Sequence, residues 1–314
     1  MALPRAIAIL GPTGSGKSAF AMRLAAELPV EIISVDSAQV YRGMDIGTAK
    51  PSAGERSAVP HHLIDIREPE QGYSAGEFRA DCLKLLEEIT ARGRVPLLVG
   101  GTMLYFRSLF QGIAEMPIAN PELRAAIDAR ARIAGWPALH AELAVRDPES
   151  AARIHTNDAQ RIQRALEVLE LSGRTLREHW NSSMQPSSFC DWHICMLQPT
   201  ERSLLHAALT ARLDAMVTAG FPEEVSKLLA RSTLSEDSAA LRLVGYRQMI
   251  PFCRGQEKLP IAVQKALHAT RQLAKRQMTW LRSSTLLPDD SYTVSCDPFD
   301  APTMEQIMRD LIKA

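Results

Sequence analysis

The sequence has few cysteines, no excess of charge of either sign and no long hydrophobic run. Its five cysteines form no C-x-x-C pair and no cysteine–histidine cluster with zinc spacing, which argues against a structural metal site. Scattered thiols in odd number fit a reducing compartment. The apolar run at 6–10 is too short for a signal-peptide core, and no segment approaches the length of a membrane span. We therefore expect a cytoplasmic protein without a membrane partner.

The charge balance limits the mode of any nucleic-acid binding. Lysine plus arginine and aspartate plus glutamate both number 36, so the formal net charge is zero. That balance argues against a basic protein that coats nucleic acid, but it leaves room for a local basic patch. The 314 residues exceed a typical single domain, so we expect two lobes.

Strand-like and helix-like patterns alternate in the first third of the chain. Three apolar runs are typical of buried strands: 6–10, 31–36 and 95–101. Apolar spacing predicts three helices: 16–28, 76–90 and 102–112. Continuous apolar strands alternating with helices favour a parallel sheet that is covered on both faces.

The middle of the chain lacks strand patterns. Residues 117–186 read as successive helices, after which an apolar strand returns at 189–198 and a last one at 292–296. We therefore predict a core of residues 1–116 and 187–314, interrupted by an all-helical insertion domain at 117–186.

Residues 11–18, GPTGSGKS, match the phosphate-binding pattern G-x-x-x-x-G-K-[ST] in full. The match follows a predicted strand and precedes a predicted helix, where backbone N–H groups and the helix dipole bind an anion. Lys17 adds a mobile positive charge, and the Ser18 hydroxyl is a natural Mg²⁺ ligand. A glycine-rich turn with an incidental lysine is the alternative. The predicted phosphate-binding residues are Gly11, Pro12, Thr13, Gly14, Ser15, Gly16, Lys17 and Ser18.

The fold class is accordingly α/β, a P-loop-type parallel sheet core with an all-helical insertion domain. A P-loop binds a diphosphate or a triphosphate and does not by itself indicate an ATPase. Strand 95–99 is followed by Gly-Gly-Thr where many nucleoside triphosphatases have a Mg²⁺-organising aspartate. The available acid is Asp36, which ends the second strand. Two kinds of chemistry stay open: phosphoryl transfer, as in a small-molecule kinase, and a reaction in which diphosphate leaves.

No aspartate or glutamate occurs between Lys258 and Pro288. A helix here would place His268, Arg271, Lys275 and Arg282 on one narrow arc. Apolar side chains would cover the opposite side: Val263, Leu267, Leu273, Ala274, Met278, Trp280 and Leu281. We expect the basic arc to contact phosphates of a nucleic acid, the alternative being a merely solvated face.

Arg161 and Arg164 lie three residues apart on a predicted helix and are therefore neighbours. Together they could clamp a diphosphate or an RNA backbone. Equally, either could pair with Glu167 or Asp158 in an ordinary surface helix, and spacing alone leaves both options open.

Several motifs together resemble the tRNA dimethylallyltransferase family, in the bacterial form without a zinc-finger extension. They run in the family's order from the first strand to the last long helix and cover nearly the whole chain. The motifs are GPTGSGKS (11–18), SVDSAQVYRGMDIGTAKP (34–51), HHLIDI (61–66), VGGTMLYF (99–106), DAQRIQRALEV (158–168), LVGYRQ (243–248) and RQLAKRQMTWLR (271–282).

The resemblance implies a prenyl transfer that depends on Mg²⁺. Dimethylallyl diphosphate would donate its dimethylallyl group to N6 of the tRNA adenine 3′ of the anticodon, and diphosphate would leave. Asp36 is then the candidate proton acceptor, and Thr102 could donate a hydrogen bond to the bridging oxygen. The amides of residues 13–18 and Lys17 would stabilise the diphosphate, with Arg161 or Arg164 closing over it or over the RNA. ATP is then not a substrate, although the pattern at 11–18 is of the nucleotide-binding kind.

The resemblance also implies a tRNA-binding set for the anticodon stem-loop, whose target base must be flipped out. We expect the protein to be a monomer. The expected tRNA-binding residues are Asp36, Ser37, Ala38, Gln39, Thr102, Arg124, Gln160, Arg161, Ile162, Gln163, Arg164, Arg242, Leu243, Val244, Gly245, Tyr246, Arg247, Lys275, Arg276 and Arg282.

Three other functions compete with this one. A small-molecule kinase would leave the acid-free helix unexplained, and a prenyltransferase acting on free adenine nucleotides would not need that basic surface. An RNA-binding protein without activity would have no use for a full P-loop.

Overall fold

The computed structural model describes residues 3–183, 189–283, 286–288 and 290–313, and the chain forms two compact units. One unit combines residues 1–110 with 187–314, and the other comprises residues 111–186. The first boundary lies six residues earlier than expected. The connecting segment belongs to the second unit because Met116 packs on that unit's core and the Glu115 carbonyl accepts a hydrogen bond from His179. The second expected boundary, after residue 186, lies outside the described residues.

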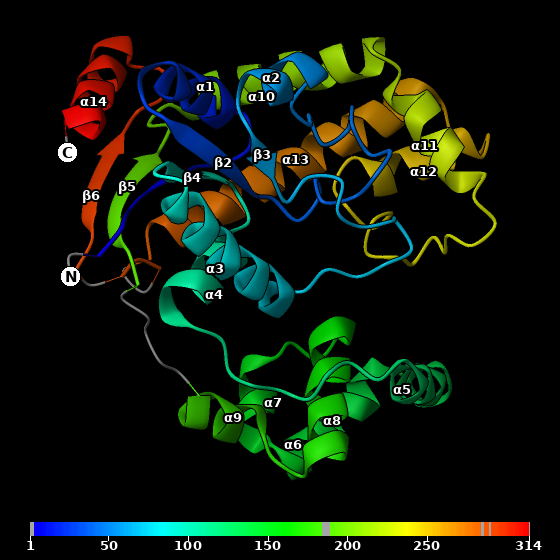
Figure 1. Cartoon of the computed structure of the whole chain (residues 1–314). Coiled ribbons are helices and arrows are strands. Elements are labelled where there is room, and N and C mark those ends of the chain that lie inside the picture. The colour runs from blue at the N-terminus through cyan, green and yellow to red at the C-terminus, as the bar shows by residue number, and fades with distance from the viewer. Residues whose placement is uncertain (1–2, 184–188, 284–285, 289, 314) are drawn as a thin grey trace. The chain divides into compact units, whose positions relative to one another are not determined.

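A six-stranded parallel sheet forms the centre of the first unit (Figure 1), which confirms the predicted sheet. Its order is β3-β2-β4-β1-β5-β6, so β1 lies between β4 and β5. The two-residue strand β3 was not predicted, because it is too short to show a period. The strands are β1 (Arg5–Leu10), β2 (Val30–Val35), β3 (His61–His62), β4 (Val95–Gly100), β5 (Asp191–Leu197) and β6 (Tyr292–Cys296).

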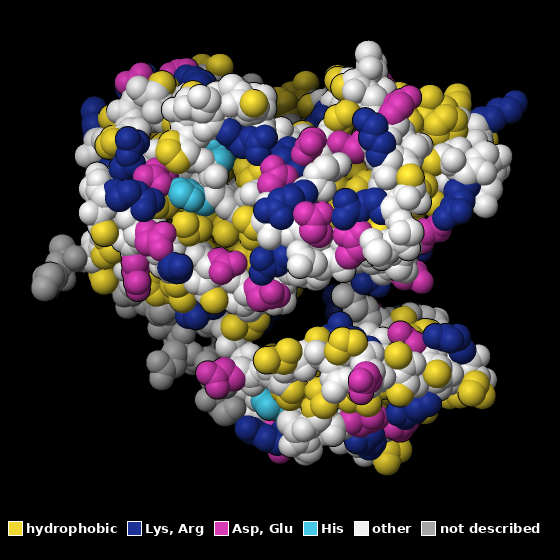
Figure 2. Space-filling view, turned by 45° about the vertical axis from the view of Figure 1, so that its right-hand side comes forward, with side chains coloured by type: hydrophobic (Ala, Val, Ile, Leu, Met, Phe, Trp, Pro, Cys, Tyr) yellow, Lys and Arg dark blue, Asp and Glu magenta, His cyan; other side chains and the backbone are white. Residues whose placement is uncertain are grey.

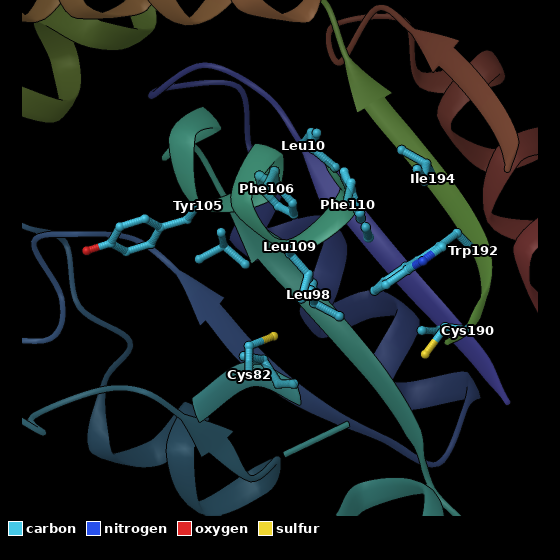
Figure 3. Packing of buried hydrophobic residues seen from close by; sticks show 14 of the residues in the cluster. Leu10, Cys82, Leu98, Tyr105, Phe106, Leu109, Phe110, Cys190, Trp192 and Ile194 are labelled. Atoms are coloured by element: carbon cyan, nitrogen blue, oxygen red, sulfur yellow. The ribbon is translucent and has the colours of Figure 1, made fainter. Parts of the chain in front are cut away.

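Helices cover both faces of this sheet, as the unbroken apolar strands require. The alternate residues of β1 divide between two cores: Ala6, Ala8 and Leu10 join the core under α3 and α4, whereas Ile7 and Ile9 join the core under α1 and α14. Figure 3 shows the first of these, where Phe110 meets Trp192 edge to face at 5.0 Å. These helices are α1 (Lys17–Glu27), α3 (Ala75–Ala91), α4 (Met103–Gln111) and α14 (Ala301–Lys313).

A third core builds the walls beyond the strand ends. It joins the segment that follows β2, through Val40, Tyr41 and Met44, to Phe221 and Tyr246 from the late helices. The helices of this region are α2 (Ala53–Ala58), α10 (Arg202–Thr218), α11 (Phe221–Leu229), α12 (Tyr246–Cys253) and α13 (Leu259–Leu281). The acid-free segment therefore forms the predicted helix, although it ends at Leu281.

The second unit is helical throughout its regular structure. Side chains of Asn120, Asp147 and Asp158 cap α5, α7 and α8, and a closed apolar core holds the helices together. The helices are α5 (Pro121–Ala134), α6 (Trp136–Arg146), α7 (Pro148–Arg153), α8 (Ala159–Ser172) and α9 (Leu176–Ser183).

The surface carries mixed charge. In the face shown in Figure 2, Lys and Arg side chains are interspersed with Asp and Glu, as the zero net charge leads one to expect. Within the described part of the chain, no helix has the length and apolar character needed to span a membrane.

Candidate active site

The P-loop connects β1 to α1 in a conformation that depends on glycine. Gly14 and Gly16 have φ angles of 79° and 74°, in the left-handed region that disfavours other residues. A Cβ on Gly14 would also lie 2.7 Å from Leu209 Cδ2. Lys17 and Ser18 begin α1, so their amides have no acceptor within the helix. This arrangement suits an anion, so the prediction of a phosphate site here stands as a prediction.

Two amides of the P-loop are bonded within the protein. The Ser15 N–H donates to the Pro12 carbonyl at 3.3 Å, so it does not point at a phosphate as expected. The Thr13 N–H donates to Gln277 Oε1 at 2.9 Å, so the expectation that every amide from Thr13 to Ser18 points at the phosphate is wrong at this residue. Gln277 also donates through Nε2 to the Gly101 carbonyl at 2.8 Å. This buried side chain therefore connects α13 to the P-loop and to the end of β4. Sequence reasoning missed Gln277, whose only signal is an amide among apolar neighbours on α13.

The surroundings of Lys17 favour the uncharged form of its amine. Its ammonium donates to the Pro12 carbonyl at 2.7 Å. Burial lowers the pKa of Lys17 to about 7, with a further lowering by Arg212 and an opposing effect of Asp36. A bound phosphate would favour the charged amine.

Two pockets open beside the P-loop. The P-loop pocket, of about 300 Å³, includes Lys17, Ser18 and Lys50 in its lining. The second pocket, of about 430 Å³, includes Thr102 and residues 242–246. Six residues line both pockets: Thr13, Asp36, Thr48, Gly101, Arg212 and Gln277. The two pockets therefore meet at the end of β2, and Asp36 is the one carboxylate in this shared lining.

The Asp36 side chain is held on one side only. Its Oδ1 accepts from the amides of Ala38 at 2.8 Å and Gln39 at 3.4 Å. Both bonds reach the same oxygen, so Oδ2 is the atom that could accept a proton from a molecule in the pockets.

Thr102 lines the second pocket and pairs with Ser37. Its hydroxyl accepts from the Ser37 amide at 3.0 Å and donates to the Ser37 hydroxyl at 3.3 Å. To donate to a bound substrate, Thr102 would have to exchange the bond to Ser37 Oγ for one to the ligand.

Arg212 is a site residue that sequence reasoning missed. It projects from α10 into both pockets, where burial lowers the pKa of its guanidinium and Asp36 raises it. Its position next to Leu213 on α10 resembles that of any surface arginine, so no local pattern could have identified it.

The acid-free helix does not divide simply into the basic face and the apolar face that were predicted. Lys275, Arg276 and Arg282 are exposed, and Arg276 lines the second pocket. Arg271, by contrast, is half-buried and donates to Thr210 Oγ1 on α10 at 3.4 Å, so its assignment to the free basic arc is wrong. Leu273, expected in the core, lines the second pocket. A two-sided helical wheel fails here because both α10 and α12 pack on α13.

Arginines of the second unit are engaged in ion pairs. Glu167, fully buried, accepts from Arg124 at 2.8 Å and from Arg164 at 2.6 Å. Arg161 pairs with Asp158 at 2.6 Å and keeps 73% of its side chain exposed. Both pairings that the sequence left open are therefore present.

The other predicted residues of α8 differ in their exposure to solvent. Ile162 was expected to bind tRNA, but it is fully buried in the helical core, so its side chain cannot contact RNA. Gln160 is exposed, and Gln163 donates to Asp128 at 2.6 Å.

These features define a P-loop α/β protein in which the P-loop pocket continues into a second pocket. The family model described as IPP transferase matches residues 39–284, and the chain belongs to that family. It is 54% identical over 293 residues to the tRNA dimethylallyltransferase of Paraburkholderia phytofirmans, covering 92% of each chain. It is 50% identical to that of Azoarcus sp., covering 98% of this chain and 96% of the relative. The resemblance inferred from the motifs is confirmed, and the protein is a transferase.

Solved structures agree with this assignment. The tRNA isopentenylpyrophosphate transferase of Bacillus halodurans superposes with a TM-score of 0.68 at 34% identity, covering 98% of this chain and 96% of that one. A eukaryotic dimethylallyltransferase acting on tRNA gives a TM-score of 0.81 at 25% identity, covering 98% of this chain and 77% of that one.

Proposed function

We propose that the protein transfers a dimethylallyl group from dimethylallyl diphosphate to N6 of the tRNA adenine 3′ of the anticodon, releasing diphosphate. The observation that carries the proposal is the meeting of the two pockets at Asp36. A diphosphate in the P-loop pocket and an adenine in the second pocket would both reach this carboxylate. A small-molecule kinase would also bind its acceptor beside the phosphate site, so the family match, and not the second pocket, argues against that alternative.

Asp36 would act on the acceptor. The exocyclic amine of adenine is a poor nucleophile because its lone pair is delocalised into the ring, and it must lose a proton as the C–N bond forms. Oδ2 of Asp36 would accept that proton, while Oδ1 keeps its bonds to Ala38 and Gln39. Thr102 would donate to the bridging oxygen of the donor after releasing Ser37.

The P-loop would stabilise the leaving group. The allylic carbon becomes positive as its bond to diphosphate breaks, so the two phosphates gain charge. The amides of Gly16, Lys17 and Ser18, the ammonium of Lys17 and the guanidinium of Arg212 line the P-loop pocket and would stabilise that charge. Arg161, whose guanidinium is exposed although it pairs with Asp158, would contact a phosphate of the RNA or of the donor, as the family resemblance implies.

The lining of the P-loop pocket fits Mg²⁺ bound together with a diphosphate. No group of three or more His, Cys, Asp or Glu among the described residues is placed to hold a metal by itself. Mg²⁺, however, usually takes one or two protein oxygens, phosphate oxygens and water, and Ser18 offers such an oxygen. The bound ion would neutralise charge on the departing diphosphate.

The tRNA would dock by its anticodon stem-loop. Its flipped adenine would enter the second pocket, where residues 242–246 and Trp280 form walls, and Lys275, Arg276 and Arg282 would contact phosphates. We propose that the active form is a monomer.

Incubation with labelled dimethylallyl diphosphate tests this function. We expect label in tRNA, at the adenine 3′ of the anticodon, and none in AMP or ATP. Label in AMP alone would indicate a nucleotide prenyltransferase instead. Phosphate transfer from ATP to a small molecule would indicate a kinase.

A further inference from the structure

A buried carboxylate outside both pockets organises the wall of the second one. Glu224 lies on α11 with 8% of its surface exposed. Its Oε2 accepts from the amides of Asp45 and Ile46, both at 2.8 Å. Its Oε1 accepts from the Gly47 amide at 3.1 Å and from the Tyr246 hydroxyl at 2.6 Å. Four donors on one buried carboxylate make strong, charge-assisted bonds.

These four donors belong to two segments that face each other. Gly47 and Tyr246 both line the second pocket, and neither lines the P-loop pocket. The two segments are also packed closely, because a Cβ on Gly47 would lie 2.2 Å from Phe221 Cε2 and 2.7 Å from the Tyr246 hydroxyl. Glu224 therefore connects the turn after Met44 to the start of α12.

The P-loop side of the same loop has anchors of its own. The buried ammonium of Lys50 donates to the Tyr41 carbonyl at 2.7 Å, to Asp65 at 2.6 Å and to Asp45 at 2.5 Å. The Thr48 hydroxyl donates to the Met44 carbonyl at 2.6 Å. Asp45 is bonded to both Glu224 and Lys50. Lys50 would nevertheless keep Tyr41 and Asp65, and Thr48 would keep Met44, so a change at Glu224 should disturb the second pocket more than the P-loop pocket.

We propose that Glu224 is a positioning residue that sets the shape of the second pocket and thereby the binding of the acceptor. The inference rests on the proposed function, because the acceptor is identified there as a tRNA adenine. Glu224→Gln keeps the size of the side chain but replaces one oxygen by an NH₂ group, which cannot accept from an amide. At least one buried donor then loses its partner.

The test is a steady-state comparison of wild type, Glu224→Gln, Tyr246→Phe and Glu223→Gln. Glu223 is the matched control because it is the exposed neighbour on the same helix. We expect Glu224→Gln to raise the KM for tRNA about tenfold and to leave the KM for dimethylallyl diphosphate within about twofold, with Glu223→Gln unchanged. Tyr246→Phe, which removes one donor, should shift the same constant in the same direction. It supplies the test if Glu224→Gln does not fold.

The outcomes separate cleanly. If Glu224→Gln lowers only the yield of folded enzyme and Tyr246→Phe leaves both KM values at wild-type levels, Glu224 has a structural role and the inference is overturned. Equal increases in both KM values would overturn it too. Absence of transfer to tRNA by the wild type would instead contradict the proposed function.

Discussion

Binding of diphosphate to the P-loop should draw a proton onto Lys17. Burial, reinforced by Arg212 and opposed by Asp36, lowers the pKa of Lys17 to about 7 in the free protein. At pH 8 roughly one tenth of the free protein would then carry the charged amine, and a phosphate beside it restores the charge. Binding should accordingly take up about 0.9 proton at Lys17 at pH 8 and about 0.1 at pH 6.

Calorimetric titration with diphosphate, in two buffers of different ionisation enthalpy, measures this uptake. Lys17→Gln is the control, since its side chain cannot titrate and its uptake reports protonation of the ligand itself. The wild type should exceed the control by nearly one proton at pH 8, and the difference should shrink towards pH 6. Equal uptake by both proteins at pH 8 would mean that Lys17 is already charged before binding, and the reasoning from its burial would be refuted.

Two further predictions concern the basic helix and the helical unit. The triple variant Lys275→Ala, Arg276→Ala, Arg282→Ala should flatten the log–log salt dependence of tRNA binding by about 0.7–0.9 per lost phosphate contact, whereas Leu267→Ala should lower thermal stability instead. An unchanged slope would mean that this surface does not contact tRNA phosphates and is only solvated. Glu167→Gln should cost about 2–3 kcal/mol in the free energy of unfolding, because two arginines lose a buried partner. A Glu167→Gln variant that unfolds at the same denaturant midpoint as the wild type would contradict this prediction.

The sheet was predictable because its central strands, β1 and β4, are almost continuous apolar runs. Such a run fits a strand that is buried on both faces, and the division of β1 between two cores shows why every position must be apolar. The two-residue strand β3 has no such run. The boundary at residue 110 was missed because residues 112–120 have no regular structure, and only tertiary contacts, such as those of Met116 and Glu115, assign them to the helical unit.

The site was predictable only where its residues are close together in sequence. The P-loop and the acid at the end of β2 follow from local pattern and from the geometry of a parallel sheet. Gln277, Arg212 and Glu224 come from three different helices and act through contacts far apart in sequence. Arg271 was misassigned for the related reason that a helical wheel cannot show how many neighbours a helix has.

The central claim is that Asp36, where the two pockets meet, takes the proton from the acceptor. Asp36→Asn tests it most directly, because the amide oxygen can still accept from Ala38 and keep the turn in place. With saturating dimethylallyl diphosphate and tRNA, kcat should fall about 10²–10⁴-fold, while both substrates still bind. Turnover near the wild-type rate under the same conditions would contradict the account.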